Sequence, residues 1–242
     1  MTGRRRFERA AERQAPRPSP LAEVADFPID VVLARIRRAV RRMRRTTLNR
    51  FAGEPATTPF QILVSCIISL RTKDDVTAAA ARRLFARADT PAAMIALGKE
   101  QAARLIYPAG FYNQKAGQIV ALSKMLIERF GGRVPDTLED LLTLKGVGRK
   151  TANLVLTIGF GKPGICVDTH VHRITNRWGY VNTRTPEQTE MALRTVLPRR
   201  YWIPINDLLV TWGQNVCTPL SPWCSRCEVA DFCRRRGVKR SR

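Results

Sequence analysis

Three observations predict an all-α fold for this chain of 242 residues. Apolar residues recur at helical spacing near the start, at Ile29, Val32, Leu33, Ile36, Val40 and Met43. Helix-start signals follow at Thr90-Pro91, a capping hydroxyl before a proline, and at Asp136-Thr-Leu-Glu139, which resembles a capping box. Hardly any segment alternates apolar and polar residues as a half-buried strand does. We therefore expect short helices joined by turns, and no sheet.

Residues 1–28 are expected to form a disordered basic arm, because they carry repeated prolines and little apolar periodicity. An amphipathic helix with one basic face should follow over residues 29–50. The apolar run from Phe60 to Leu70 has about half of the ~20 residues that a bilayer span needs. It predicts a buried helix, and we expect no membrane span.

The formal net charge of +22 indicates a polyanionic partner. Residues 1–50 hold 14 basic and five acidic side chains, and the remainder holds 28 and 15, so the excess belongs to the folded body as well. Such a field attracts nucleic acid and speeds encounter with it. An anionic membrane fits less well, since no basic helix carries an aromatic face for insertion.

Residues 141–156 indicate a helix, a tight turn and a second helix. Gly146 and Gly148 allow the positive φ or the close approach that such a turn needs, and Val147 between them can enter the core. The N–H groups that begin the second helix would face outward, where a DNA phosphate can bind them. By itself, the Gly-x-Gly pattern fits an ordinary corner between two helices equally well.

Lys150 stands two residues past this turn, where a cation faces the positive end of the helix dipole at a cost of roughly a few tenths of a kcal/mol. A phosphate contact would explain the placement. So would chemistry, because the dipole and nearby basic groups favour the neutral amine that can attack a carbon. A merely solvated lysine is the alternative.

Asp168 follows in the segment Val167-Asp-Thr-His170, where it can cap a helix and still act as a catalytic carboxylate. The only two histidines, His170 and His172, diverge on a helix and lack a third partner. For them we expect polar packing or hydrogen bonds rather than a metal.

Four of the six cysteines fall within 17 residues, at Cys217, Cys224, Cys227 and Cys233. The N-terminus shows no apolar stretch typical of a secretory signal, so we expect a reducing compartment and free thiols. The clustering indicates a metal site, and its spacing leaves zinc and an iron–sulfur cluster open, with buried structural thiols as a third reading. Cys66 and Cys166 lie in apolar runs and should be core residues.

Together these features resemble the endonuclease III family of helix-hairpin-helix DNA glycosylases. The resemblance runs from about Phe60 to Cys233 and rests on four pieces in this order: Gly110-Phe-Tyr-Asn-Gln-Lys-Ala116, Gly146-Val-Gly-Arg-Lys-Thr-Ala-Asn153, Val167-Asp-Thr-His170 and the four-cysteine run. It implies a bifunctional DNA glycosylase and AP lyase of base excision repair. Its partner would be double-stranded DNA with damaged pyrimidines or abasic sites, bound by a monomer in the cytoplasm, at the nucleoid.

The resemblance also implies the site residues. Lys150 would be the Schiff-base nucleophile and Asp168 the catalytic aspartate. DNA contacts would come from the hairpin, at Lys145, Gly146, Val147, Gly148 and Arg149. The four-cysteine run would bind a four-iron, four-sulfur (4Fe-4S) cluster.

By the same resemblance the fold would comprise two helical domains with a DNA-binding cleft between them. A six-helix module would cover residues 52–163 and include the helix-hairpin-helix at about 137–157. The iron–sulfur cluster domain would combine residues 29–51 with residues 164–238. Lys150 and Asp168 would then face each other across the cleft.

Three positions depart from the family pattern. Lys145 stands before the hairpin where relatives often have proline, which adds a charge near the phosphates. Arg71 stands where many relatives carry a glutamine that fills the gap left by an extruded base, and Phe111 stands at a wedge position that is usually aliphatic. The sequence therefore predicts that both contact DNA but does not predict the opposite-base preference.

Two rival functions stay open at this stage. One is a glycosylase of the same superfamily that removes bases without nicking the strand, against which Lys150 argues. The other is a non-catalytic DNA-binding protein whose four late cysteines hold zinc.

Overall fold

A computed structural model describes residues 26–43 and 57–242 of the chain. Every regular element in these two ranges is helical, which confirms the predicted all-α fold. The α-helices are α2 (Ile29–Val40), α4 (Pro59–Ser69), α5 (Asp74–Phe85), α6 (Pro91–Ile106), α7 (Tyr112–Phe130), α8 (Leu138–Leu142), α9 (Arg149–Leu154), α10 (Thr169–Trp178), α11 (Pro186–Val196) and α12 (Pro204–Asn215). Short π or 3₁₀ segments are η1 (Val155–Gly159), η2 (Arg199–Tyr201), η3 (Cys224–Arg226) and η4 (Ala230–Phe232).

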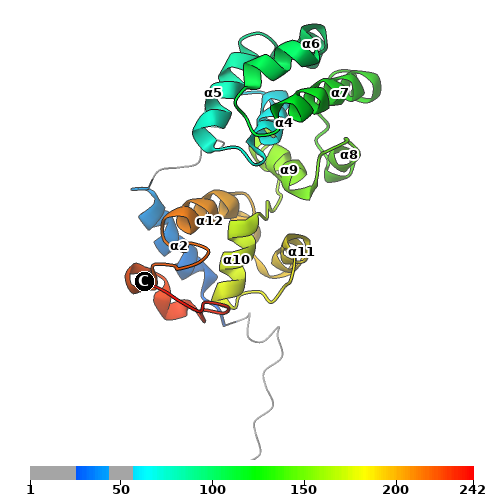
Figure 1. The fold of residues 1–242 in the computed structure, drawn as a ribbon. Coiled ribbons are helices and arrows are strands. Elements are labelled where there is room, and N and C mark those ends of the chain that lie inside the picture. The colour runs from blue at the N-terminus through cyan, green and yellow to red at the C-terminus, as the bar shows by residue number, and fades with distance from the viewer. Residues whose placement is uncertain (1–25, 44–56) are drawn as a thin grey trace, which may run out of the picture.

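The helices gather in two groups (Figure 1), and each group surrounds its own hydrophobic cluster. Helices α4 to α9 and η1 form the first cluster, and α2 with α10, α11 and α12 forms the second. Residues 160–168 connect η1 of the first group to α10 of the second. The predicted limits of the two domains remain a prediction, because residues 44–56, which separate α2 from α4, lie outside the described ranges.

Local capping explains where the helices of the first cluster begin. Thr58 and Gln61 form a reciprocal capping box before α4, which confirms a buried helix close to the predicted range of 60–70. The predicted start of α6 is also confirmed, since the Thr90 side chain accepts the N–H of Ala93 and Pro91 is the first helical residue. These caps replace hydrogen bonds that the first turn of a helix lacks.

The start of α8 corrects the sequence prediction by one residue. Thr137, not Asp136, caps the helix, and its hydroxyl accepts the N–H of Asp140 at 3.2 Å. Asp136 pairs instead with the ammonium of Lys162 at 2.6 Å. The helix also ends at Leu142 rather than at Leu144. Asp136 thus has a partner distant in sequence, and the next residue, Thr137, caps the helix.

Helix α2 is shorter than predicted. It ends at Val40, whereas the apolar spacing predicted a helix to residue 50. The N–H groups of Arg42 and Met43 bond to carbonyls three residues back, at 3.2 and 3.0 Å, so the last turn tightens into a 3₁₀ geometry. Residues 44–50 lie outside the described ranges, as does the predicted basic arm except for residues 26–28. No described helix is both long and apolar enough to cross a bilayer.

Candidate active site

The hairpin between α8 and α9 has the predicted form. Gly146 has a φ of 82°, and a Cβ at this position would collide with the side-chain amide of Gln118, which donates to the Gly146 carbonyl at 3.2 Å. Val147 is buried, as predicted. Gly148 has an ordinary φ of −91° and open space where a Cβ would lie. Only Gly146 is therefore required by the turn, while Gly148 leaves the start of α9 uncovered.

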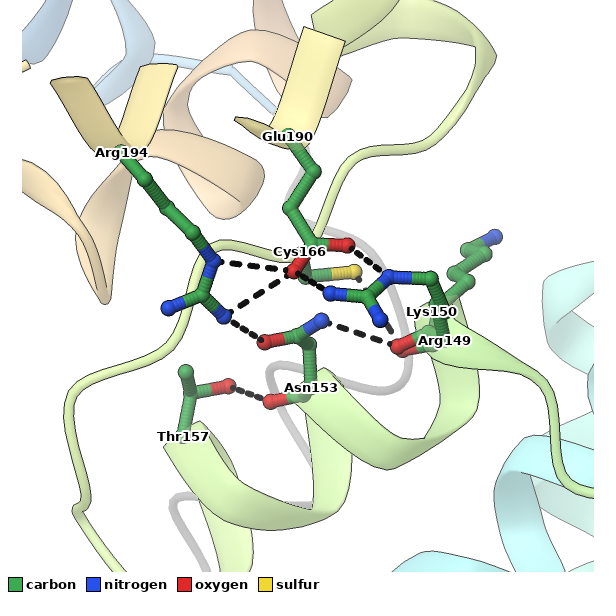
Figure 2. Close-up of polar contacts among 7 residues, drawn as sticks. All are labelled: Arg149, Lys150, Asn153, Thr157, Cys166, Glu190 and Arg194. Carbon is green, nitrogen blue, oxygen red and sulfur yellow. Dashed lines mark hydrogen bonds and ion pairs between the residues drawn. The ribbon is translucent and has the colours of Figure 1, made fainter. Parts of the chain in front are cut away.

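Lys150 is the second residue of α9, and its side chain is exposed. In the described part of the chain its ammonium makes no hydrogen bond or ion pair. Its backbone carbonyl accepts a weak bond from the buried thiol of Cys166 at 3.7 Å. Figure 2 shows the amine pointing away from the polar cluster on the other side of the helix. The backbone of Lys150 is thus fixed in α9, whereas its ammonium has no partner in the described residues.

Asp168 caps α10, as the sequence predicted. Its Oδ1 atom accepts the N–H groups of His170 and Val171 at 2.8 and 2.9 Å, and the side chain is buried. Asp168 and Lys150 line one cleft, although 18 residues separate them in sequence. The other residues lining this cleft are Arg149, Val167, Thr169, Pro186, Glu187 and Glu190. The cleft therefore lies where α9 of the first group meets α10 and α11 of the second.

Arg149 precedes Lys150 on α9, and its side chain points toward Glu190 of α11, away from that of Lys150 (Figure 2). Its guanidinium donates two hydrogen bonds to Glu190 on α11, at 2.8 and 2.7 Å, and Arg194 donates to the same carboxylate (Figure 2). Burial alone would raise the pKa of Glu190, but the hydrogen bonds from both arginines outweigh burial and lower it. The sequence assigned Arg149 to DNA, whereas the structure gives its side chain a protein partner.

The two histidines make hydrogen bonds, as predicted. His172 Nδ1 lies 2.6 Å from the Thr189 hydroxyl, and His170 Nδ1 lies 3.0 Å from a guanidinium nitrogen of Arg173. Burial, the largest effect, lowers the pKa of His170. The His172 ring therefore links α10 to α11, whereas the His170 ring bonds within α10.

Arg71 and Phe111 lie beside each other, although they come from different loops. The Arg71 guanidinium carbon is 5.7 Å from the centre of the Phe111 ring. Both residues have left-handed backbones, with φ of 52° and 58°, and the Phe111 side chain is 56% exposed. A positive φ is unusual for such side chains, so the surrounding structure must hold this pair in place.

Lys115 supplies that support, and sequence reasoning missed it. Its buried ammonium donates to the carbonyls of Ile68 and Leu70 at the end of α4, and to the Thr72 hydroxyl. The loop that carries Arg71 is thereby fixed to α7, directly after Phe111. Lys115 falls within the segment Gly110–Ala116 that carries the family resemblance, which was its only sequence signal.

Comparisons with known proteins agree with this geometry. The model of the HhH-GPD superfamily of base excision DNA repair proteins matches residues 64–199. The Endonuclease III of Thermotoga maritima is 47% identical over 202 residues, which cover 82% of this chain and 95% of that protein. This chain belongs to the endonuclease III family.

Two further family members show how much of the chain the similarity covers. Endonuclease III homolog 2, chloroplastic, of Arabidopsis thaliana is 43% identical over 72% of this chain, and the chain spans 47% of that longer protein. A solved structure described as a trapped endonuclease III–DNA covalent intermediate is 31% identical, with a TM-score of 0.76 over 86% of this chain and 94% of that one. The fold is thus that of endonuclease III across most of the chain.

The four late cysteines of this family member surround a single cavity. Cys217, Cys224, Cys227 and Cys233 line it together with Trp178, Trp212 and Trp223, among others. All six cysteines are free thiols, and Cys66 and Cys166 are buried in the first core, as predicted. Burial is the largest effect on the pKa of Cys227, which is raised to about 11. In the described ranges no three His, Cys, Asp or Glu side chains meet closely enough to hold one metal ion.

Proposed function

We propose that this chain is a bifunctional DNA glycosylase and AP lyase that removes damaged pyrimidines from double-stranded DNA. The observation that carries the proposal is the exposed amine of Lys150, which lacks a protein partner in the described ranges and shares a cleft with the buried carboxylate of Asp168. A lysine that served only stability would be expected to make a bond to the protein. Family membership, together with the endonuclease III–DNA structures among its relatives, supports the same activity.

In the proposed reaction the lone pair of the Lys150 amine attacks C1′ of the deoxyribose as the damaged base leaves with the bonding electrons. The nitrogen bound to C1′ then loses a proton, the C1′–O4′ bond breaks as O4′ takes up a proton, and a Schiff base between C1′ and the lysine nitrogen remains. Loss of a proton from C2′ expels the 3′ phosphate and cuts the strand. Asp168 is suited to stabilise the cationic sugar, because its Oδ1 accepts both capping bonds and Oδ2 has no hydrogen bond in the described ranges.

DNA binding in this proposal uses three surfaces. The basic excess of the folded body attracts the backbone, and the uncovered start of α9 with Lys145 offers donors to a phosphate. Arg71 and Phe111 would fill the gap that an extruded nucleotide leaves in the stack. Their contact in the structure supports a joint role, since one side chain alone is smaller than a base pair.

The proposed cofactor is a 4Fe-4S cluster held by Cys217, Cys224, Cys227 and Cys233. All four thiols line one cavity, and four cysteine thiolates are the ligand set that such a cluster takes, one for each iron. When bound, the cluster would cross-link the loop that carries Arg226 and Arg234 and would take no part in base removal.

Borohydride trapping tests the proposed activity directly. The full chain is incubated with duplexes that contain thymine glycol or an abasic site, in the presence of borohydride, which reduces a Schiff base to a stable adduct. We expect a covalent protein–DNA band on both duplexes and strand cleavage when borohydride is left out. Base removal without trapping or nicking would favour a glycosylase that lacks lyase activity.

Two simpler measurements test the remaining parts of the proposal. Absorption near 400 nm is expected for the cluster, and a colourless protein that contains zinc and never traps would favour a non-catalytic DNA-binding protein. Sedimentation with a duplex should give one protein per DNA, as for a monomer. The proposed location is a reducing cytoplasm at the nucleoid, which the basic charge and the free thiols support.

A further inference from the structure

Glu190 of α11 is the most highly connected carboxylate in the cleft region. Its side chain is 3% exposed, and its two oxygens accept two hydrogen bonds from Arg149 and two from Arg194, between 2.7 and 3.1 Å. Arg149 begins α9, which packs in the first cluster, whereas α11 packs in the second. The carboxylate therefore joins the two groups of helices at the start of the helix that carries Lys150.

A second connection holds the same helix one turn later. The Arg194 guanidinium lies 3.5 Å from Oδ1 of Asn153, and the Asn153 amide donates to the Arg149 carbonyl at 3.0 Å. Asn153 is completely buried. Figure 2 shows the resulting cluster, in which Glu190 and Arg194 reach from α11 to two successive turns of α9. Two anchors on one helix restrict its rotation as well as its translation.

Lys150 lies between these two anchors in sequence, and its side chain points away from the cluster that Glu190 and Arg194 form with α9 (Figure 2). Its partner in the cleft, Asp168, belongs to α10, which packs with α11 in the second group. The separation of amine and carboxylate is thus set by how α9 sits against α11. The planar, bidentate contact between Arg149 and Glu190 suits this task, because it fixes orientation in addition to distance.

We propose that Glu190 is a positioning residue that, through Arg149 and Arg194, holds Lys150 at the correct place opposite Asp168. This role rests on the function proposed above. Glu190 does not touch the reacting atoms in this account. An apolar contact of similar size would hold the helices together but would let α9 slide or rotate, and a misplacement of about 1 Å can slow an enzymatic step about 100-fold.

The test compares the rate of chemistry with DNA affinity. Glu190→Gln keeps the shape of the side chain and removes its charge, so both arginines lose their counter-ion. At saturating abasic duplex we expect the single-turnover trapping rate to fall about 10- to 100-fold. Affinity for a duplex with a tetrahydrofuran abasic analogue should change by less than about threefold, because phosphate contacts dominate it. Glu128→Gln, on the exposed face of α7, is the matched control and should behave as the parent chain.

Two milder variants keep the test decisive if Glu190→Gln does not fold. Glu190→Asp retains the charge but shortens the reach, and it should restore part of the rate relative to Glu190→Gln. Arg194→Gln leaves the Arg149 pair intact and removes the connection to Asn153, with an expected loss of about three- to tenfold. All rates are measured where circular dichroism shows the variants fully folded.

The outcomes separate this proposal from the proposed function. A parent chain that never traps overturns both. A parent chain that traps, with folded Glu190 and Arg194 variants that trap at the parental rate, overturns the positioning role alone. Equal losses of rate and DNA affinity would also contradict it, because they would place Glu190 in binding rather than in alignment.

Discussion

Two neighbouring cations at the start of α9 are used in opposite ways. Arg149 is bound by a buried carboxylate from another helix, whereas the side chain of Lys150 is exposed and has no hydrogen bond or ion pair in the described residues. Both carry the same charge in the same helical turn, where the helix dipole disfavours them equally. In the proposed function, the Arg149 side chain fixes the position of α9, and the Lys150 side chain is left available for reaction.

The largest expected effect comes from removing the free cation. Lys150→Gln should lower borohydride trapping and strand nicking at least about 1,000-fold, because no other group replaces a covalent nucleophile. Its free energy of unfolding should change by less than about 0.5 kcal/mol, since the side chain makes no stabilising contact. Lys124→Gln, on α7, removes an exposed lysine and is the control. A Lys150→Gln protein that still nicks the strand would show that Lys150 is not the nucleophile.

A substitution at Asp168 can separate its capping of α10 from its proposed role in catalysis. Asp168→Asn keeps a side-chain oxygen that can accept the His170 and Val171 N–H groups, since Asn and Asp cap helices about equally well. We expect the trapping rate to fall about 100-fold while stability falls by less than about 1 kcal/mol. Single-turnover kinetics and urea unfolding provide the two numbers. A large loss of stability with little loss of rate would show that Asp168 is only a cap.

Arg149→Met should lower stability, which Lys150→Gln should not, and so sharpens the contrast. It leaves the buried Glu190 with Arg194 alone, and we expect a loss of about 1–3 kcal/mol in the free energy of unfolding. This figure lies below that for a fully buried pair because the Arg149 side chain is 34% exposed. Urea unfolding of Arg149→Met, Lys150→Gln and the parent measures the contrast. Equal stability of the two variants would contradict the view that Arg149 stabilises the fold and Lys150 does not.

The smallest effect concerns another cation, Lys115, whose side chain is buried rather than exposed. Burial lowers its pKa from 10.5 to about 8. Between these two values the unfolded chain keeps the proton and the folded chain does not, so this group makes stability rise with pH across that window. Below pH 8 both states are protonated, and the cost of burying the charge is constant. An NMR titration of the Lys115 side chain should show a midpoint near 8, and a midpoint near 10 would contradict this.

How far the sequence could predict the molecule depended on how local each interaction is. Thr90 and Asp168 bond to residues within three positions, and Gly146 is favoured by its own positive φ, so their roles followed from the local sequence. Neither the pairing of Arg149 with Glu190 nor that of Asp136 with Lys162 could be predicted, because both join residues far apart in the chain. The predicted DNA contact of Arg149 stays a prediction, while the predicted start of α8 was wrong by one residue.

The site residues divide in the same way. A lysine placed against the helix dipole could be recognised locally, and the cleft it shares with Asp168 agrees with the juxtaposition that the family resemblance implied. The contact between Arg71 and Phe111 needed the fold, because the positive φ of each residue depends on packing rather than on propensity.

The most direct test of the central claim is to locate the adduct itself. After borohydride reduction on an abasic duplex, the complex is digested with nuclease and trypsin, and the modified peptide is sequenced by mass spectrometry. We expect the deoxyribose remnant on Lys150, in a peptide that begins directly after Arg149. An adduct on any other lysine or on the N-terminal amine would contradict the account.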